Sequence, residues 1–170
     1  MGMTPDQYFE AFVDPNRWDC HEMPGDIRRA FNAAVSASHV ADHYFTYHKR
    51  HNPEKVVSFD RIGQFVEHLE TETNGSFRDI RSISNAYKHL YNSNGPTARF
   101  ETINSCGSIE RLELQENDEI EEMEEEYVGG EEGESRLAVM FKRKDGTQGD
   151  FLSELDIVVD YLHDLIYDDA

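Results

Sequence analysis

The spacing of hydrophobic residues divides the chain into a helical first part and a mixed second part. Between residues 26 and 92, apolar side chains recur every three or four positions, as they do on one face of an α-helix. This spacing predicts three helices, over 26–50, 58–73 and 76–92. The many alanines of 26–50 would allow close helix contacts, so we expect this helix to be central in a bundle.

Local capping signals mark where the helices begin. Thr4 and Gln7 form a capping box around Pro5, which predicts a short helix at the start of the chain. The segment 14–24 contains two prolines and is predicted to be a loop. Ser58 and Ser76 are the expected N-caps of the next two helices.

After residue 95 the hydrophobic pattern changes to the alternation typical of strands. Strands are predicted near 98–103, 109–114 and 136–143. The first two would be joined by a hairpin loop, and Asp145-Gly146 predicts a second tight turn with a short return strand. A helical pattern returns over 153–167.

These elements predict an α+β protein. We expect a single domain over 1–170, in which an N-terminal helical bundle (1–95) is followed by a small antiparallel β-sheet and a C-terminal helix (96–170). A chain of this length buries enough apolar surface to fold without disulfides or a metal.

The charge of the chain is concentrated in one segment. The formal net charge is −19, and residues 110–134 hold 13 Asp and Glu against one basic residue, Arg111. Like charges repel, so we expect 115–135 to form a flexible acidic loop. The acidic balance also argues against binding duplex DNA through the overall charge, because DNA-binding proteins present a basic surface.

Cysteine usage and hydropathy indicate the compartment. Cys20 and Cys106 are the only cysteines and do not form a metal-binding motif. No apolar run approaches the ~20 residues of a membrane span, and no signal segment opens the chain. We therefore expect a reduced, cytoplasmic protein that does not contact a membrane.

The helix predicted over 76–92 carries a polar stripe on one side. At about 100° per residue, its members fall opposite the apolar residues of the same helix; they are Arg78, Arg81, Asn85, Lys88, His89 and Asn92. Cationic and amide groups gathered on an otherwise acidic chain predict a site for an anionic partner. The alternative is the solvated side of an amphipathic helix.

A helical bundle with arginine and histidine late in one of its last helices resembles the HEPN superfamily (higher eukaryotes and prokaryotes nucleotide-binding). The resemblance covers about 26–95 and depends on the segment from Arg81 to His89. Members of this family often act as metal-independent ribonucleases in toxin–antitoxin and phage-defence systems, with Arg and His from two subunits meeting across a dimer interface. The resemblance implies that Arg81 stabilises developing phosphate charge and that His89 is a general acid or base. Seven residues separate the two here, more than in the family motif, and this spacing favours binding over RNA cleavage.

Two histidines on the 26–50 helix form a weak candidate for a metal site. His39 and His43 stand four residues apart, so both imidazoles could reach one ion. No third ligand follows at a suitable spacing, and two histidines on a polar helix face explain the pattern better.

Asp42 offers a structural explanation for part of the stripe. It is expected at the edge of the apolar face, where a carboxylate needs a partner. Arg81 or Lys88 of the neighbouring helix would provide one.

The sequence therefore predicts a protein that works by binding, with no cofactor. The partner would be a protein or an anionic ligand at the Arg78–Asn92 stripe, in a prokaryotic or phage defence or counter-defence setting. The alternatives are a metal-independent ribonuclease of HEPN type, and an acidic inhibitor that mimics nucleic acid through the acidic segment 115–135. A homodimer is compatible with each of these functions.

Overall fold

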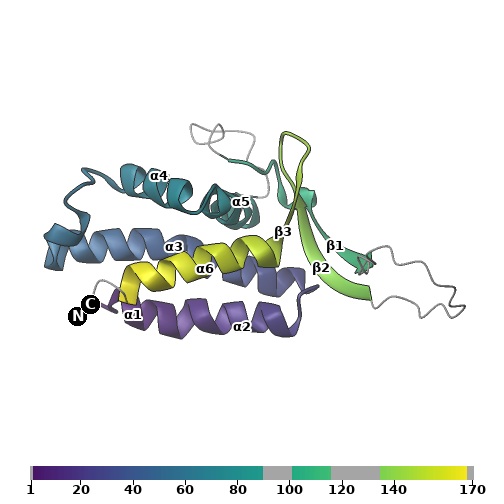
Figure 1. The fold of residues 1–170 in the computed structure, drawn as a ribbon, viewed down its shortest axis with the longest axis horizontal. Coiled ribbons are helices and arrows are strands. Elements are labelled where there is room, and N and C mark those ends of the chain that lie inside the picture. The colour runs from purple at the N-terminus through teal and green to yellow at the C-terminus, as the bar shows by residue number, and fades with distance from the viewer. Residues whose placement is uncertain (1, 90–100, 116–134, 168–170) are drawn as a thin grey trace, which may run out of the picture.

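The structure is a helical bundle with a small antiparallel sheet at one end (Figure 1). This computed structural model describes residues 2–89, 101–115 and 135–167. Apart from its end residues, the expected acidic loop 115–135, which is also the segment proposed to mimic nucleic acid, lies outside the described residues. Mostly helical structure with a three-stranded sheet and a final helix confirms the predicted α+β class.

The N-terminal region is helical for longer than the sequence predicts. The capping box of Thr4 and Gln7 is present, and α1 (Pro5–Tyr8) continues through a π-helical turn (Phe9–Val13) into α2 (Asp14–Glu22). The predicted loop over 14–24 is therefore wrong for most of its length. Proline normally interrupts a helix because its ring clashes with the carbonyl four residues earlier. Here the wider π turn precedes Pro15 and relieves that clash.

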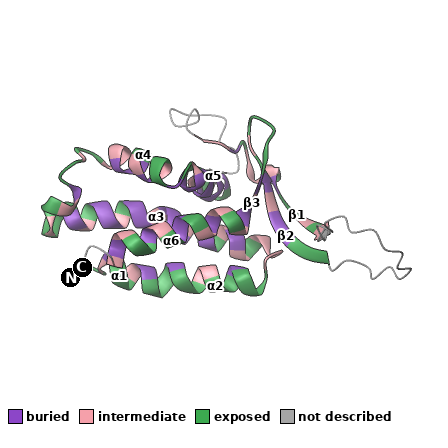
Figure 2. Ribbon diagram, viewed as in Figure 1, coloured by how far each residue is buried: buried purple, intermediate pink, exposed green. Residues whose placement is uncertain are grey.

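Helix α3 (Ile27–His51) is the central element, as predicted. The carboxylate of Asp26 caps it by accepting hydrogen bonds from the backbone N–H groups of Arg28 and Arg29. Its buried face is rich in alanine and packs against α5 (Ser76–His89) and α6 (Phe151–Tyr167). Figure 2 shows the buried residues of these helices facing one another.

The predicted caps of α4 and α5 are both replaced by other residues. After a 3-10 turn (Pro53–Val56), α4 (Ile62–Glu72) begins four residues after Ser58. At α5 the Thr73 hydroxyl, and not that of Ser76, accepts the hydrogen bond from Phe77 N at 3.0 Å. The intervening turn uses positive φ at Asn74 and Gly75, which agrees with the predicted end of the preceding helix.

The sheet has the order β1-β2-β3 and is antiparallel throughout. Its strands are β1 (Ile109–Gln115), β2 (Ser135–Lys142) and the short return strand β3 (Gln148–Asp150). The predicted strand over 98–103 is wrong where it is described, since 101–103 contains no strand and 106–108 forms a 3-10 turn. Ile103 is instead fully buried in the hydrophobic core. Its apolar character therefore reflects packing against the bundle and not a place in a hairpin.

The β1–β2 pair extends away from the bundle (Figure 1). Phe141 and Val139 are buried where the pair meets the helices, whereas Leu137, further along the same face, is 39% exposed. Among the described residues, no helix is long and apolar enough to cross a membrane.

Candidate functional site

Two members of the polar stripe on α5 are bound within the protein. Arg78 contacts the carboxylate of Glu70 with its Nη2 atom at 2.7 Å. The Asn85 amide donates a hydrogen bond to Glu101 Oε1, also at 2.7 Å. Glu101 thus contacts the middle of the stripe, and Arg78 and Asn85 have partners within the fold.

Of the other stripe residues, Arg81 is described in full, His89 only in its backbone, and Asn92 not at all. Arg81 is half-buried, and no ion pair joins it to another described residue. His89 is the last residue of α5, but its side chain is not described, and Asn92 lies outside the described residues. Asp42 is exposed and forms no ion pair with Arg81 or Lys88, so the prediction of a pairing at the apolar edge is wrong.

Lys88 connects the stripe to a second polar surface. Its Nζ atom lies 2.6 Å from His39 Nε2, which brings together residues that are 49 positions apart in the chain. His39 belongs to the outward face of α3, where it lines a groove of about 700 Å³. The groove is bounded by the N-terminal segment and by α3; its lining is Gly2, Met3, Thr4, Tyr8, His39, Asp42, His43, Thr46, Tyr47, Arg50 and His51.

Aromatic contacts hold one wall of the groove in place. The rings of Tyr8 and His43 are stacked, with centroids 4.9 Å apart. His43 Nε2 also lies 2.8 Å from the backbone oxygen of Met3, which ties the start of the chain to α3. The Tyr8 hydroxyl donates to the carbonyl of Ser36 at 3.3 Å. These contacts position the N-terminal segment beside α3 and so form the groove.

The contact between Lys88 and His39 determines the protonation state of the imidazole. An ammonium group has only donors, so Nε2 must accept and the ring must be neutral with its proton on Nδ1. Burial lowers the pKa of His39, the Lys88 charge lowers it further, and the charge of Asp42 opposes this shift. His39 therefore contributes a neutral imidazole to the groove lining, and Lys88, which is not itself a lining residue, holds a positive charge next to that ring.

We expect the pKa of His39 to lie below the ~6.5 of an unperturbed histidine, and Lys88→Met to raise it. As pH falls below ~6.5, the His39 imidazole is protonated in the unfolded chain at a higher pH than in the folded protein. The stability that the neutral His39 contributes is therefore fully present above ~6.5 and is lost as pH falls through its lowered folded-state pKa. NMR titration of the imidazole measures the shift. Lys49→Met is the control, because Lys49 binds the Asp60 carbonyl and not a histidine. An unchanged His39 pKa in Lys88→Met contradicts the assignment.

A shared metal at His39 and His43 finds no support in the geometry. The Nε2 atoms of the two rings face different partners, Lys88 Nζ and Met3 O. Across the described part of the chain, no group of three or more His, Cys, Asp or Glu residues is placed to hold an ion.

The cysteines do not contribute a nucleophile to this surface. Burial raises the pKa of Cys20 to about 12, and the nearby Asp19 charge adds to the effect. The thiol is therefore protonated at neutral pH and lies within the core.

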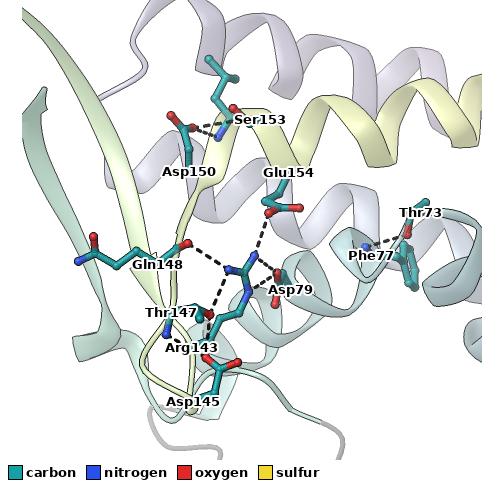
Figure 3. Close-up of polar contacts among 11 residues, drawn as sticks. Thr73, Phe77, Asp79, Arg143, Asp145, Thr147, Gln148, Asp150, Ser153 and Glu154 are labelled. Atoms are coloured by element: carbon teal, nitrogen blue, oxygen red, sulfur yellow. Dashed lines mark hydrogen bonds and ion pairs between the residues drawn. The ribbon is translucent and has the colours of Figure 1, made fainter. Parts of the chain in front are cut away.

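A buried ion network that the sequence does not reveal joins the sheet to the bundle (Figure 3). Arg143, just after β2, contacts Asp79 of α5 at 2.6 Å and Glu154 of α6 at 2.8 Å. The same guanidinium donates to the carbonyl of Gln148 at 3.1 Å. The hydrogen bond to Asp79 is the main cause that raises the pKa of Arg143. One feature of the sequence pointed to Asp79 as a residue with a specific partner, since it is the only acid between residues 78 and 92.

This network has a structural role. Every nitrogen of the Arg143 guanidinium contacts a group of the protein itself, and the Asp79 side chain is only 5% exposed. The groove at His39 is therefore the better candidate for a functional site.

Comparison with known proteins finds no family model, curated protein or solved structure that matches the chain. The resemblance to the HEPN superfamily accordingly stays a prediction.

Proposed function

We propose that the protein acts by binding a partner and that the groove beside α3 holds an anionic group of that partner. The observation that carries the proposal is the meeting of Lys88 with His39 at the groove, where Arg50 supplies a second positive charge. In this proposal Lys88 is the stripe residue that takes part in binding, whereas Arg78 and Asn85 stabilise the fold through their contacts with Glu70 and Glu101.

The size and chemistry of the groove support binding of this kind. Ligand sites in proteins typically have volumes of ~300–1,000 Å³ and combine apolar walls with a few polar groups. The groove has about 700 Å³, with walls from Tyr8 and Tyr47. Asp42 is the only carboxylate among the lining residues, so the fixed charges of Arg50 and Lys88 exceed it at neutral pH.

The binding test uses two fluorescent probes, an acidic peptide and a short single-stranded RNA of equal charge. We expect Arg50→Gln combined with Lys88→Gln to weaken binding of at least one probe by about tenfold, because each substitution removes a cation. Fluorescence anisotropy measures the affinities. Binding should also weaken with salt, as exposed charges are screened within ~8 Å at physiological ionic strength.

Arg28→Gln combined with Lys142→Gln is the matched control, because it also removes two positive charges and neither residue lines the groove. Arg28 lies at the other end of α3, its side chain is 71% exposed, and it does not line the groove. Equal losses in the control and in the variant at Arg50 and Lys88 would show that only the overall charge matters. The proposal would then be wrong, as it would be if neither probe bound the wild type.

A metal-independent ribonuclease is the second candidate. The observation that favours it is the aromatic lining of the groove, since unpaired bases stack on aromatic rings; Arg81 and His89 are not among the lining residues, so the RNA would have to extend beyond the groove to reach them. In this case Arg81 would stabilise the developing phosphate charge and His89 would transfer the proton, as the HEPN resemblance implies. Cleavage of the RNA probe without added metal, lost in Arg81→Ala and in His89→Ala, would support this function. A prokaryotic or phage defence or counter-defence setting belongs to the first proposal, in which the protein binds a partner.

A further inference from the structure

Strand β1 leaves one of its edges without a partner among the described residues. It is the outermost strand in the order β1-β2-β3, and it is seven residues long. Exposed edges of this length present unpaired N–H and C=O groups that favour pairing with another strand. The groove at α3 lies elsewhere on the molecule, so this surface is independent of the proposed function.

The register determines which backbone groups point outward. Val139 N donates to the Pro24 carbonyl at 3.1 Å, so the odd residues of β2 direct their backbone groups away from β1. The even residues therefore pair with β1, where Ala138 lies opposite Leu112. By alternation, the N–H and C=O groups of Arg111 and Glu113 point toward the open edge.

We propose that a second copy of this chain pairs with this edge, β1 against β1, in an antiparallel register centred on Leu112. Two-fold symmetry then places Leu112 opposite Leu112 of the other copy, and Arg111 opposite Glu113 in both directions. Arg111 and Glu113 become hydrogen-bonded pairs, and the central leucines become a non-hydrogen-bonded pair. This is the alternation that antiparallel strands require. The result is a continuous six-stranded sheet.

Charge complementarity supports a second copy as the partner. The sequence Ile109-Glu-Arg-Leu-Glu-Leu-Gln115 is self-complementary in this register, because each of the two pairs joins an arginine to a glutamate. Opposite charges directly across antiparallel strands are stabilising. Both side chains are exposed, and Arg111 forms no ion pair with another described residue. Glu113 accepts a hydrogen bond from the Ser135 hydroxyl at one oxygen, which leaves the second oxygen for Arg111.

The pairing would also extend an apolar surface. Leu112, Leu114 and Met140 lie on the same face of the sheet and are only partly buried in one copy, and the exposed Glu110 lies on this face beside them, opposite Leu114 of the other copy in the proposed register. In the dimer, Leu112 of each copy would meet at the two-fold axis, with Cβ atoms ~4.5–5.5 Å apart.

The antiparallel arrangement keeps the two acidic segments apart. Each segment begins after Gln115, which would face Ile109 of the other copy. The two ends are then separated by about 20 Å of strand. That distance exceeds the ~8 Å over which physiological salt screens exposed charges.

The test measures the mass of the full-length chain by sedimentation equilibrium. Because a strand pair buries less than the ~1,200 Å² of a standard interface, we expect a weak dimer and extend the measurement to about 100 µM. Arg111→Glu and Glu113→Arg each place like charges opposite one another. Each should raise the dimer dissociation constant by at least about tenfold. Lys142→Glu is the control, with the same charge change as Arg111→Glu at an exposed position away from the edge.

Mixing the two variants gives the decisive result. One variant carries glutamates at 111 and 113 and the other carries arginines, so the 1:1 mixture should recover dimerisation while each variant alone does not. The double variant Arg111→Glu with Glu113→Arg should dimerise like the wild type. The proposal is wrong if the wild type stays monomeric throughout, if both single variants still dimerise, or if the mixture does not.

Discussion

Replacing Arg143 with methionine is expected to lower the free energy of unfolding by about 3 kcal/mol, since removing one member of a buried ion pair leaves the other charge unpaired. The Arg143 side chain is 22% exposed, and its guanidinium contacts Glu154 and Asp79, whose side chain is 5% exposed. Methionine keeps much of the side-chain volume, so the loss reports on charge and hydrogen bonds. Urea unfolding at 25 °C measures it.

Arg136→Met is the matched control, because Arg136 lies in the same hairpin and contacts Asp150. That pair is more open, with 46% of the arginine side chain exposed. We expect a loss below about 1 kcal/mol, as measured for most exposed ion pairs. Equal losses in the two variants would mean that Arg143 is not the link between sheet and bundle.

The second large effect is expected from Phe141→Ala, at about 3–4 kcal/mol. Phe141 is 1% exposed, and its ring lies against the backbone of Gly149 in the neighbouring strand. The Arg143 guanidinium carbon lies 4.9 Å from the centroid of the same ring. Truncation therefore removes apolar burial and a cation–π contact together.

Leu137→Ala tests whether this loss depends on burial. Leu137 lies on the same strand and face as Phe141 but is 39% exposed, so we expect its truncation to cost less than about 1 kcal/mol. Chemical denaturation of both variants under the same conditions gives the comparison. A loss at Leu137 as large as that at Phe141 would show that the hairpin arm is packed along its whole length.

The sequence predicts the long helices well because their signals are local. The apolar spacing lies within α3 and its cap, Asp26, immediately precedes it, and the turn at Asn74-Gly75 has the positive φ that glycine and asparagine favour. The same logic fails at 101–103, where the buried Ile103 reflects contact with the bundle. It also fails over 14–22, because a π turn that accommodates Pro15 has no distinct sequence pattern.

For the candidate site, the sequence identifies residue types but not their partners. It singles out His39 and Lys88 separately, one as a weak metal ligand and the other as part of a stripe. Their 2.6 Å contact depends on how α3 crosses α5. The partner of Asp79 is Arg143, 64 positions further along the chain, and no local spacing relates them.

By itself, the sequence determined the helices α3 to α6, the strands β1 and β2 with the short return strand, and the concentration of negative charge in 110–134, because these follow from neighbouring residues along the chain. Only the tertiary structure decided which stripe residues are bound within the fold, that a groove forms beside His39, and that β1 is an outer strand of the described sheet. The physical reason is that ion pairs, grooves and strand order depend on distances between elements. Packing of the complete chain sets those distances, and local preferences do not.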